Sequence, residues 1–371
     1  MDKQASTELL KNMLKIYSPS GREEKLAAFL KTELRNLSFE RVRTDTAGNV
    51  YGEVGSGSPT VLLCGHMDTV PGRVAVKTED GQLYGRGAVD AKASLAALIS
   101  AASSFEPSRR TGRVVVVGVV EEEQTAKGIR QLLREDLKVD YAVFGEPSGV
   151  NNITFAYKGK LGLRITCKTV SGHVGAQHLL DNAIEKSFEL WNGLKTCCAR
   201  YRSPHGVFYS LTPCLAHISS KRTSGGVPDV CVLEVDLRLP PKVRSDIAAT
   251  LVEEVVGGFQ GTNQRVSVSL EVTDRVEPFV AKRTTPVMKA LREAILKVTG
   301  GPVRFLRKTG TGDMNIFGAE TGVPVATYGP GDARLSHTSR EYIDISEYLT
   351  SVEVYKRFLE EILLGTSNET P

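Results

Sequence analysis

Residues 60–71 read TVLLCGHMDTVP. The first part of this stretch is an apolar run typical of a buried strand. We expect the strand to end within the stretch, which places His66 and Asp68 on the loop that follows. In open α/β sheets ligands bind beside the carboxyl ends of the strands. A metal-binding histidine is usually oriented by a carboxylate on its other ring nitrogen, so the pair indicates a supported metal ligand or an inert solvated pair.

Two further strands are expected to end in carboxylates. Residues 113–120 read RVVVVGVV, the most apolar run of the chain, and lead directly into the acidic triplet 121–123. Residues 141–145 read YAVFG and lead into Glu146. Because the carboxyl ends of parallel strands share one edge of a sheet, we expect these carboxylates to lie near His66.

Asp90 ends the turn GRGAVD, residues 85–90, whose glycines permit a tight backbone path. An Ala- and Leu-rich helix is expected over residues 91–103. The alternation of strands and helices predicts an α/β fold with a mostly parallel sheet and helices on both faces.

The pattern changes after about residue 160. Residues 161–168 alternate between apolar and polar side chains, as in a half-exposed antiparallel strand. The elements that follow are expected at residues 182–194 (helix), 211–218 and 230–239 (strands), 244–259 (helix) and 265–272 (strand). This β-α-β-β-α-β order is ferredoxin-like. We therefore predict an inserted α+β domain over 161–274, within a catalytic domain formed by 1–160 and 275–371.

Near the N-terminus, Ser20 is expected to cap a helix, with Glu23 completing a capping box. A closing helix is expected over residues 345–364.

Composition excludes several classes of protein. The 371 residues carry a formal charge of +4 without a long basic run, which argues against nucleic-acid binding. The six cysteines include no CxxC pair, so we expect reduced thiols. The first residues lack an apolar signal core, and no apolar run is long enough to span a membrane. We therefore expect a cytoplasmic protein.

Two imidazoles and three carboxylates form the candidate ligand set. Such groups cannot gather unpaired in a crevice, because desolvation costs several kcal/mol per ion. Oxygen and nitrogen ligands without thiolates suit zinc first, with cobalt or manganese as alternatives. Five ligands for two ions require one bridging carboxylate, as in two-metal hydrolytic sites. The set is His66, Asp90, Glu123, Glu146 and His337.

The acidic triplet offers more than one ligand. Adjacent carboxylates at a strand end cannot all point at one ion, so one can bind metal while its neighbour takes a proton from water. The alternative is a solvated acidic run. Its position directly after the most apolar strand favours the first interpretation.

These motifs, together with GEP at residues 145–147, resemble the di-metal M20 family of deacylases and peptidases. That family includes acetylornithine deacetylase, succinyl-diaminopimelate desuccinylase and carboxypeptidase G2-like enzymes. The resemblance covers nearly the whole chain. It implies that His66 and Glu146 bind one metal, Glu123 and His337 bind the other, and Asp90 bridges them.

The resemblance also implies supporting roles. Asp68 would orient His66, and Glu122 would be the catalytic base, with Glu123 as the ligand of the triplet. A cis peptide bond is implied between Asp90 and Ala91. The sequence departs from the family here, because residues 90–93 read DAKA where relatives usually have DMKG.

His173 lies in the segment SGHVG, residues 171–175, which resembles a family motif. The resemblance implies that its imidazole reaches the active site of a neighbouring subunit and stabilises the oxyanion. The inserted domain would then serve as lid and dimerisation domain of a homodimer. The alternative is a structural histidine.

Substrate recognition is assigned by resemblance to Arg238, Gly310, Thr311 and Asp313. An arginine suits a substrate carboxylate, and Asp313 could pair with the amino group of lysine or ornithine. The alternatives are a surface charge on a strand and a solvated acid.

The loop TGTGDMN, residues 309–315, resembles a particular branch of the family. Its members release lysine or ornithine from the C-terminal glutamate of LysW, an acidic amino-group carrier protein of lysine and arginine biosynthesis. Other interpretations are an N-acetylornithine, N-acetyl-lysine or succinyl-diaminopimelate deacylase, a dipeptidase or carboxypeptidase, and a binding protein without activity. Basic residues that could attract an acidic carrier are Arg73, Lys77, Lys158, Lys160, Arg304, Arg307 and Lys308.

Overall fold

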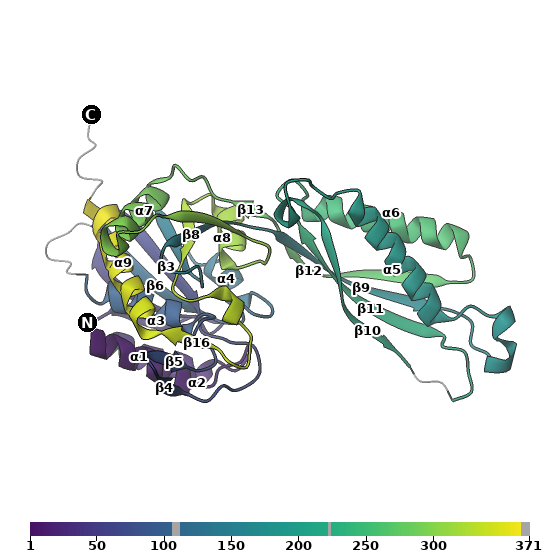
Figure 1. Ribbon diagram of the computed structural model, residues 1–371, viewed down its shortest axis with the longest axis horizontal. Helices are drawn as coiled ribbons and strands as arrows, with labels where there is room; N and C mark the ends of the chain where they lie inside the picture. Colours follow the sequence, from purple (N-terminus) through teal and green to yellow (C-terminus); the bar gives the residue numbers. More distant parts are fainter. Residues whose placement is uncertain (106–111, 222–223, 365–371) are drawn as a thin grey trace. The chain divides into compact units, whose positions relative to one another are not determined.

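A computed structural model describes residues 1–105, 112–221 and 224–364. The chain divides into two compact units, coloured along the sequence in Figure 1. The first consists of Met1–Phe155, Ala281–Leu306 and Gly312–Pro371, and the second of Ala156–Val280 and Arg307–Thr311. The second unit thus extends beyond the range 161–274 at both ends and includes the start of the TGTGDMN loop.

A mixed sheet forms the centre of the first unit. Its strands are β1 (Glu40–Thr44), β2 (Val50–Ser56), β3 (Thr60–His66), β6 (Gly112–Val119), β7 (Tyr141–Gly145), β8 (Asn152–Tyr157), β14 (Arg304–Lys308) and β15 (Val325–Tyr328). The order is β1-β2-β6-β3-β7-β15-β8-β13, where β13 is the short strand Phe279–Val280, and β14 also pairs with β8. The central strands β6, β3, β7 and β15 run parallel. The outer strands β1, β2 and β8 are antiparallel to their neighbours.

The two central strands follow from their sequences. Every residue of β3 is buried, and in β6 only Arg113 is partly exposed. Near-continuous apolar runs are expected where a parallel strand is covered on both faces. The predicted α/β class is confirmed, with the parallel arrangement confined to the middle of the sheet.

Helices cover both faces of this sheet. They are α1 (Lys3–Lys15), α2 (Glu24–Asn36), α3 (Lys92–Ala102), α4 (Lys127–Leu132), α7 (Pro286–Thr299), α8 (Asp313–Thr321) and α9 (Ile345–Leu364). On β7, Gly145 faces Leu98 of α3, whereas its neighbour Phe144 packs on Phe317 of α8 at a ring distance of 5.5 Å. Adjacent strand residues point to opposite faces, so α3 and α8 lie on opposite sides. Helices α1 and α9 pack against α3, and α7 packs against α9 (Figure 1).

A small antiparallel sheet connects two loops of the first unit. It consists of β4 (Lys77–Glu79), β5 (Gln82–Tyr84) and β16 (Tyr342–Asp344), in the order β16-β5-β4. Because β5 precedes the GRGAVD turn and β16 follows His337, this pairing brings the two loops side by side.

The second unit has the predicted β-α-β-β-α-β order. Its elements are β9 (Gly159–Lys168), α5 (Ala183–Ala199), β10 (Thr212–Ser220), β11 (Val230–Leu239), α6 (Ser245–Thr262) and β12 (Ser267–Val276), with a short β13 (Phe279–Val280). The strand order is β10-β11-β9-β12, all antiparallel. Alternate residues of β9 and β11 are buried against α5 and α6, as the alternating sequence predicted.

Two sequence predictions need correction. No helix was expected at α8, which begins inside the Gly-rich loop. Its helical pattern is weak because Asp313, Met314, Asn315, Ile316, Phe317 and Gly318 are all buried in succession. The capping box is also wrong, because α2 begins after Glu23 without a side-chain cap.

The cysteines behave as predicted. All six are free thiols, and Cys64, Cys167, Cys198 and Cys231 are buried. Across the ranges that the structure describes, no helix combines the length and apolar character needed to cross a lipid bilayer.

Candidate metal centre

The five candidate ligands come together at the carboxyl edge of the sheet in the first unit. His66 is the last residue of β3, and Glu146 directly follows the neighbouring β7. Glu123 follows β6, which flanks β3 on its other side. Asp90 ends the turn before α3, and His337 lies between a short 3₁₀ turn at Ala333–Leu335 and β16.

Asp90 lies between the two imidazoles. Its Oδ1 is 3.3 Å from Nε2 of His66, and its Oδ2 is 3.3 Å from Nε2 of His337. Nε2 of His66 is also 3.6 Å from Oε1 of Glu146, and Nε2 of His337 is 2.8 Å from Oε1 of Glu123. Each imidazole therefore has its own carboxylate, and the two share the third.

These distances fit divalent cations. Two ligand atoms bound at about 2.0–2.1 Å to one tetrahedral ion lie about 3.3–3.4 Å apart. Ligand atoms of His66, Asp90 and Glu123 also lie within 4.8 Å of one another. Imidazole nitrogens and carboxylate oxygens are suitable ligands for zinc, cobalt or manganese. The residues present thus fit a pair of such ions.

The ring of His66 is held in a defined orientation. Its Nδ1 lies 2.9 Å from the carbonyl oxygen of Asp68 and 3.4 Å from the Asp68 Oδ1. A proton on Nδ1 leaves the Nε2 lone pair directed at Asp90 and Glu146. The backbone of Asp68, as well as its carboxylate, thus supports His66.

The carboxylate of Asp68 anchors the acidic triplet. Its Oδ1 accepts the backbone N–H of Glu122, and its Oδ2 accepts that of Glu123, both at 3.0 Å. The Ser20 hydroxyl donates to Oδ2 at 2.7 Å. Burial raises the pKa of Asp68, but the hydrogen bonds outweigh burial and lower it overall. The Asp68 carboxylate is therefore negatively charged, and it holds the loop after β6 beside the end of β3.

Three residues near the N-terminus bond to the loops that follow β3 and β6, and the predicted capping box does not form. The Ser18 hydroxyl donates to the carbonyl oxygen of Met67 at 2.8 Å. Oε1 of Glu23 accepts the N–H groups of Gly21 and Glu121, each at 3.0 Å. Ser20 and Glu23 thus support the site instead of capping α2. Their spacing gave a capping signal, and nothing local in the sequence distinguishes the two uses.

The three acidic residues have different surroundings. The Glu121 side chain accepts from the Thr125 hydroxyl at 2.6 Å and pairs with Lys127 at 3.4 Å. Glu123 reaches His337, as described above. Glu122 lies between these two, and burial, with the nearby Glu146 charge, raises its pKa well above the ordinary value. Glu122 is thus the proton-accepting candidate of the triplet by position.

The electrostatics of the cluster favour cations. Hydrogen bonds to Asp90 and Glu123 raise the pKa of His337 to about 10. Burial opposes the charged form of His66, yet its bonds to Asp68 and Asp90 raise its pKa well above the ordinary value. Negative charge therefore exceeds what the imidazoles neutralise, and divalent ions offset that excess.

Asp313 belongs to the same electrostatic environment. It is the first residue of α8 and is buried. Burial raises its pKa to about 8, with the charges of Glu146 and Asp68 adding to the effect of burial. A cationic group nearby would restore its charge.

The other proposed substrate residues lie in the second unit. Arg238 on β11 pairs with Asp236 through its Nε at 2.8 Å and its Nη2 at 3.1 Å. Its Nη1 donates to the Thr311 hydroxyl at 3.4 Å. A Cβ on Gly310 would meet no atom within 4 Å, so this glycine is not required for close packing. Arg238 and Thr311 thus come together, and Arg238 already has an acidic partner.

His173 is exposed and begins a 3₁₀ helix, Val174–Leu179. Its Nδ1 accepts the N–H of Gly175 at 3.0 Å. The ring proton is then on Nε2, which makes the exposed edge of the imidazole a hydrogen-bond donor.

The peptide bond between Asp90 and Ala91 is cis, as the resemblance implied. A contributor that the sequence did not reveal is Glu341, which is fully buried and contacts the Asp90 turn. It lies in a loop without periodicity, and only its closeness to His337 could have drawn attention to it.

The fold and the cluster define a class, the metal-dependent hydrolases of amide bonds. Residues 62–361 match the model of Peptidase family M20/M25/M40, and the chain belongs to this family. The resemblance inferred from the motifs is thereby confirmed.

Named relatives cover nearly the whole chain. The LysW-lysine hydrolase of Deinococcus radiodurans is 33% identical over 98% of this chain and 99% of its own. The LysW-lysine/LysW-ornithine hydrolase of Saccharolobus islandicus is 32% identical over 97% and 96%. Among solved structures, a dinuclear metal-binding M20 peptidase from Bacillus subtilis has a TM-score of 0.75 at 12% identity, covering 98% of both chains. The last comparison concerns the fold alone.

Proposed function

We propose that this enzyme releases lysine, ornithine or both from the C-terminal glutamate of the carrier protein LysW by hydrolysing the amide bond. The observation that carries the reaction class is the position of Asp90, with one carboxylate oxygen toward each imidazole. The substrate is supported by the relatives of Deinococcus and Saccharolobus, whose names state this activity. We further propose two zinc ions, with cobalt or manganese as substitutes, a cytoplasmic location and a homodimer.

Two bound divalent ions would lower the pKa of a water molecule and polarise the amide carbonyl. Glu122 accepts the proton of the attacking water on its carboxylate as the C–O bond forms. Glu122 then gives this proton to the amine nitrogen as the C–N bond breaks. Asp68 keeps Glu122 in place through the backbone, and the products are the carrier glutamate and the free amino acid.

His173 and Arg238 are proposed to act on the substrate. The Nε2–H of His173 suits an oxyanion, and in a homodimer it would complete the site of the neighbouring subunit. The guanidinium of Arg238 would bind a carboxylate of the substrate. It would then lose part of its pairing with Asp236. Asp313 is the proposed partner of the substrate amino group.

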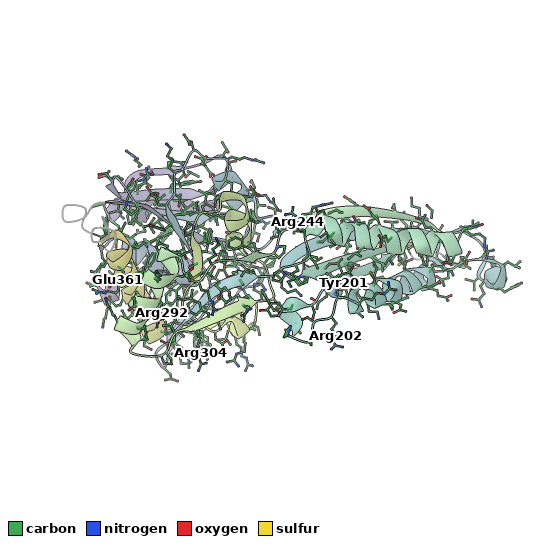
Figure 2. The ribbon with its side chains drawn as sticks, turned by 90° about the horizontal axis from the view of Figure 1, so that it is seen from above. Tyr201, Arg202, Arg244, Arg292, Arg304 and Glu361 are labelled. Atoms are coloured by element: carbon green, nitrogen blue, oxygen red, sulfur yellow. The ribbon has the colours of Figure 1, made fainter. Side chains whose placement is uncertain are left out.

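The basic residues proposed to attract the carrier are not equivalent. Lys158 is buried, and its amine donates to the carbonyl oxygen of Ser210 at 2.6 Å. Lys160 pairs with Asp274 at 3.0 Å. Arg304, labelled on the surface in Figure 2, and Arg307 are exposed. The exposed arginines are therefore better candidates for contact with an acidic carrier than Lys158.

A substrate panel tests the proposal. Purified enzyme with zinc or cobalt is incubated with lysine and ornithine conjugates of LysW, N-acetyl-lysine, N-acetylornithine, succinyl-diaminopimelate and dipeptides. We expect the highest kcat/KM for a carrier conjugate, and a preference for a small acyl compound or dipeptide would overturn the substrate assignment. Raising the salt concentration should lower kcat/KM for the conjugate more than for acetyl-lysine, since salt screens exposed charges.

A further inference from the structure

A single carboxylate oxygen holds the turn that carries Asp90. Oε1 of Glu341 accepts three backbone N–H groups, from Gly87 at 3.1 Å, Val89 at 2.9 Å and Asp90 at 3.0 Å. These amides lie in a tight turn and have no strand partner. An anionic acceptor that draws all three to one point fixes the backbone on which the Asp90 side chain stands.

The second oxygen of Glu341 binds Arg86. Nη1 of Arg86 donates to Oε2 at 2.9 Å, and the two side chains are only 9% and 1% exposed. Nε of Arg86 donates to the carbonyl oxygen of Gly72 at 3.0 Å. The guanidinium therefore bridges Glu341 and the loop that follows β3.

These contacts connect three of the ligand-bearing loops. Gly72 belongs to the loop that begins at His66, the three amides belong to the turn of Asp90, and Glu341 itself lies four residues after His337. The backbone N–H of Gly85 also donates to the carbonyl oxygen of Glu341 at 3.3 Å. The pair thus connects the two imidazoles and the carboxylate between them through buried bonds.

Stability alone is a weak reason for such a pair. Burying two charges costs several kcal/mol per ion, and a well-packed apolar replacement is often as stable. What an apolar pair cannot supply is a fixed register between loops from different parts of the chain. Metal sites depend on such contacts behind the ligands, whose removal typically weakens metal affinity or activity.

We infer that Arg86 and Glu341 are positioning residues, which hold Asp90 at the distance from His66 and His337 that binding of two divalent cations requires. This inference rests on the proposed hydrolase centre. The two residues would determine cation affinity without contacting either the cations or the substrate.

The test uses Glu341→Gln, Arg86→Lys and a matched control, Asp140→Asn, in the full-length protein. The glutamine oxygen can still accept the three amides, but its NH₂ group then faces the Arg86 donor. Lysine cannot reach Gly72 and Glu341 together, because it lacks the planar fork. The Asp140 carboxylate accepts the N–H of Thr60 at 2.7 Å, at the start of β3 and about 20 Å from His66.

Cobalt is the probe. Affinity is measured by competition with a chromophoric chelator, geometry by the cobalt absorption spectrum, and folding by Tm and circular dichroism. We expect about 10- to 100-fold weaker cobalt binding and an altered spectrum for Glu341→Gln and Arg86→Lys, and wild-type binding for Asp140→Asn. In turnover, kcat should fall while KM changes little, and high cobalt should restore part of the loss.

The result that overturns the inference is wild-type cobalt affinity and spectrum in both variants, whatever happens to Tm. If Glu341→Gln fails to fold, the cobalt affinity and spectrum of Arg86→Lys decide whether the inference holds. Failure of the proposed function is distinguished by the wild-type protein, which would then bind cobalt but hydrolyse no compound of the panel.

Discussion

The two units support their candidate residues in different ways. In the first unit, His66 and Asp68 are almost completely buried, and the carboxylates of Asp68 and Glu341 accept backbone amides from two loops. In the second unit, the exposed ring of His173 accepts the amide two residues ahead, and Arg238 pairs with a side chain of its own strand. We therefore expect changes near Asp68 and Glu341 to affect stability and the metal centre, and changes at His173 and Arg238 to leave both unaffected.

The largest expected effect is removal of the cations. Chelation should reduce turnover to the background rate, and added zinc, cobalt or manganese should restore it, because the proposed reaction requires the cations that the five candidate ligands would hold. The second unit should be unaffected by chelation, which limited proteolysis can report.

The same experiment has a pH dependence with a definite sign. The pKa of His337 is raised to about 10 without a cation, so its imidazole is protonated at neutral pH. Binding of a cation at Nε2 must displace that proton. Cation affinity should therefore rise with pH up to about 10, with proton release measurable by calorimetry in buffers of different ionisation enthalpy. Affinity independent of pH between 6 and 9 would contradict the assignment of His337.

Next in size is Glu122→Gln, which removes the proposed proton acceptor and should lower kcat by about 10²- to 10⁴-fold. Cation affinity should change little, because Glu122 is not one of the five ligands. The matched control is Glu121→Gln, whose side chain bonds to Thr125 and Lys127 and whose turnover should stay near wild type. The opposite result would move the catalytic role to Glu121.

A smaller effect is expected for Asp68→Asn. An asparagine can accept only one of the two amides of Glu122 and Glu123 and turns a donor toward the other, which should cost about 1–3 kcal/mol of unfolding free energy. Turnover should fall by about 10- to 100-fold. Urea unfolding and kcat measure the two effects. Ser20→Ala removes one neutral donor and should cost only about 1 kcal/mol, so equal effects of both variants would argue against Asp68 as the anchor.

The smallest effects should come from the second unit. His173→Asn and Arg238→Lys should leave Tm and cation affinity unchanged, because His173 is exposed and Arg238→Lys keeps a cation beside Asp236. Their kcat/KM should fall by about tenfold, the loss expected when one charged hydrogen bond of about 1.5 kcal/mol is weakened. Loss of cation affinity in either variant would contradict the expectation that the second unit does not support the metal centre.

Much of this organisation could be predicted from local sequence. Apolar runs identified β3 and β6 because a strand buried on both faces needs them, and alternation identified β9 and β11 because one face of that sheet is exposed. Helix α8 was missed, since a short helix buried all round has no amphipathic period. Ser20 and Glu23 were misassigned, because a capping signal and a long-range hydrogen bond use the same residue types.

The residue types alone predicted which side chains gather at the carboxyl edge of the sheet, since imidazoles and carboxylates directly after buried strands have few other uses. The contacts that hold those side chains in place could be seen only in the folded protein. The donors to the carboxylates of Asp68 and Glu341 are backbone N–H groups far away along the chain, and every residue except proline has such a group. The acceptor of a given N–H group is therefore known only from the folded structure, in which the loops lie side by side.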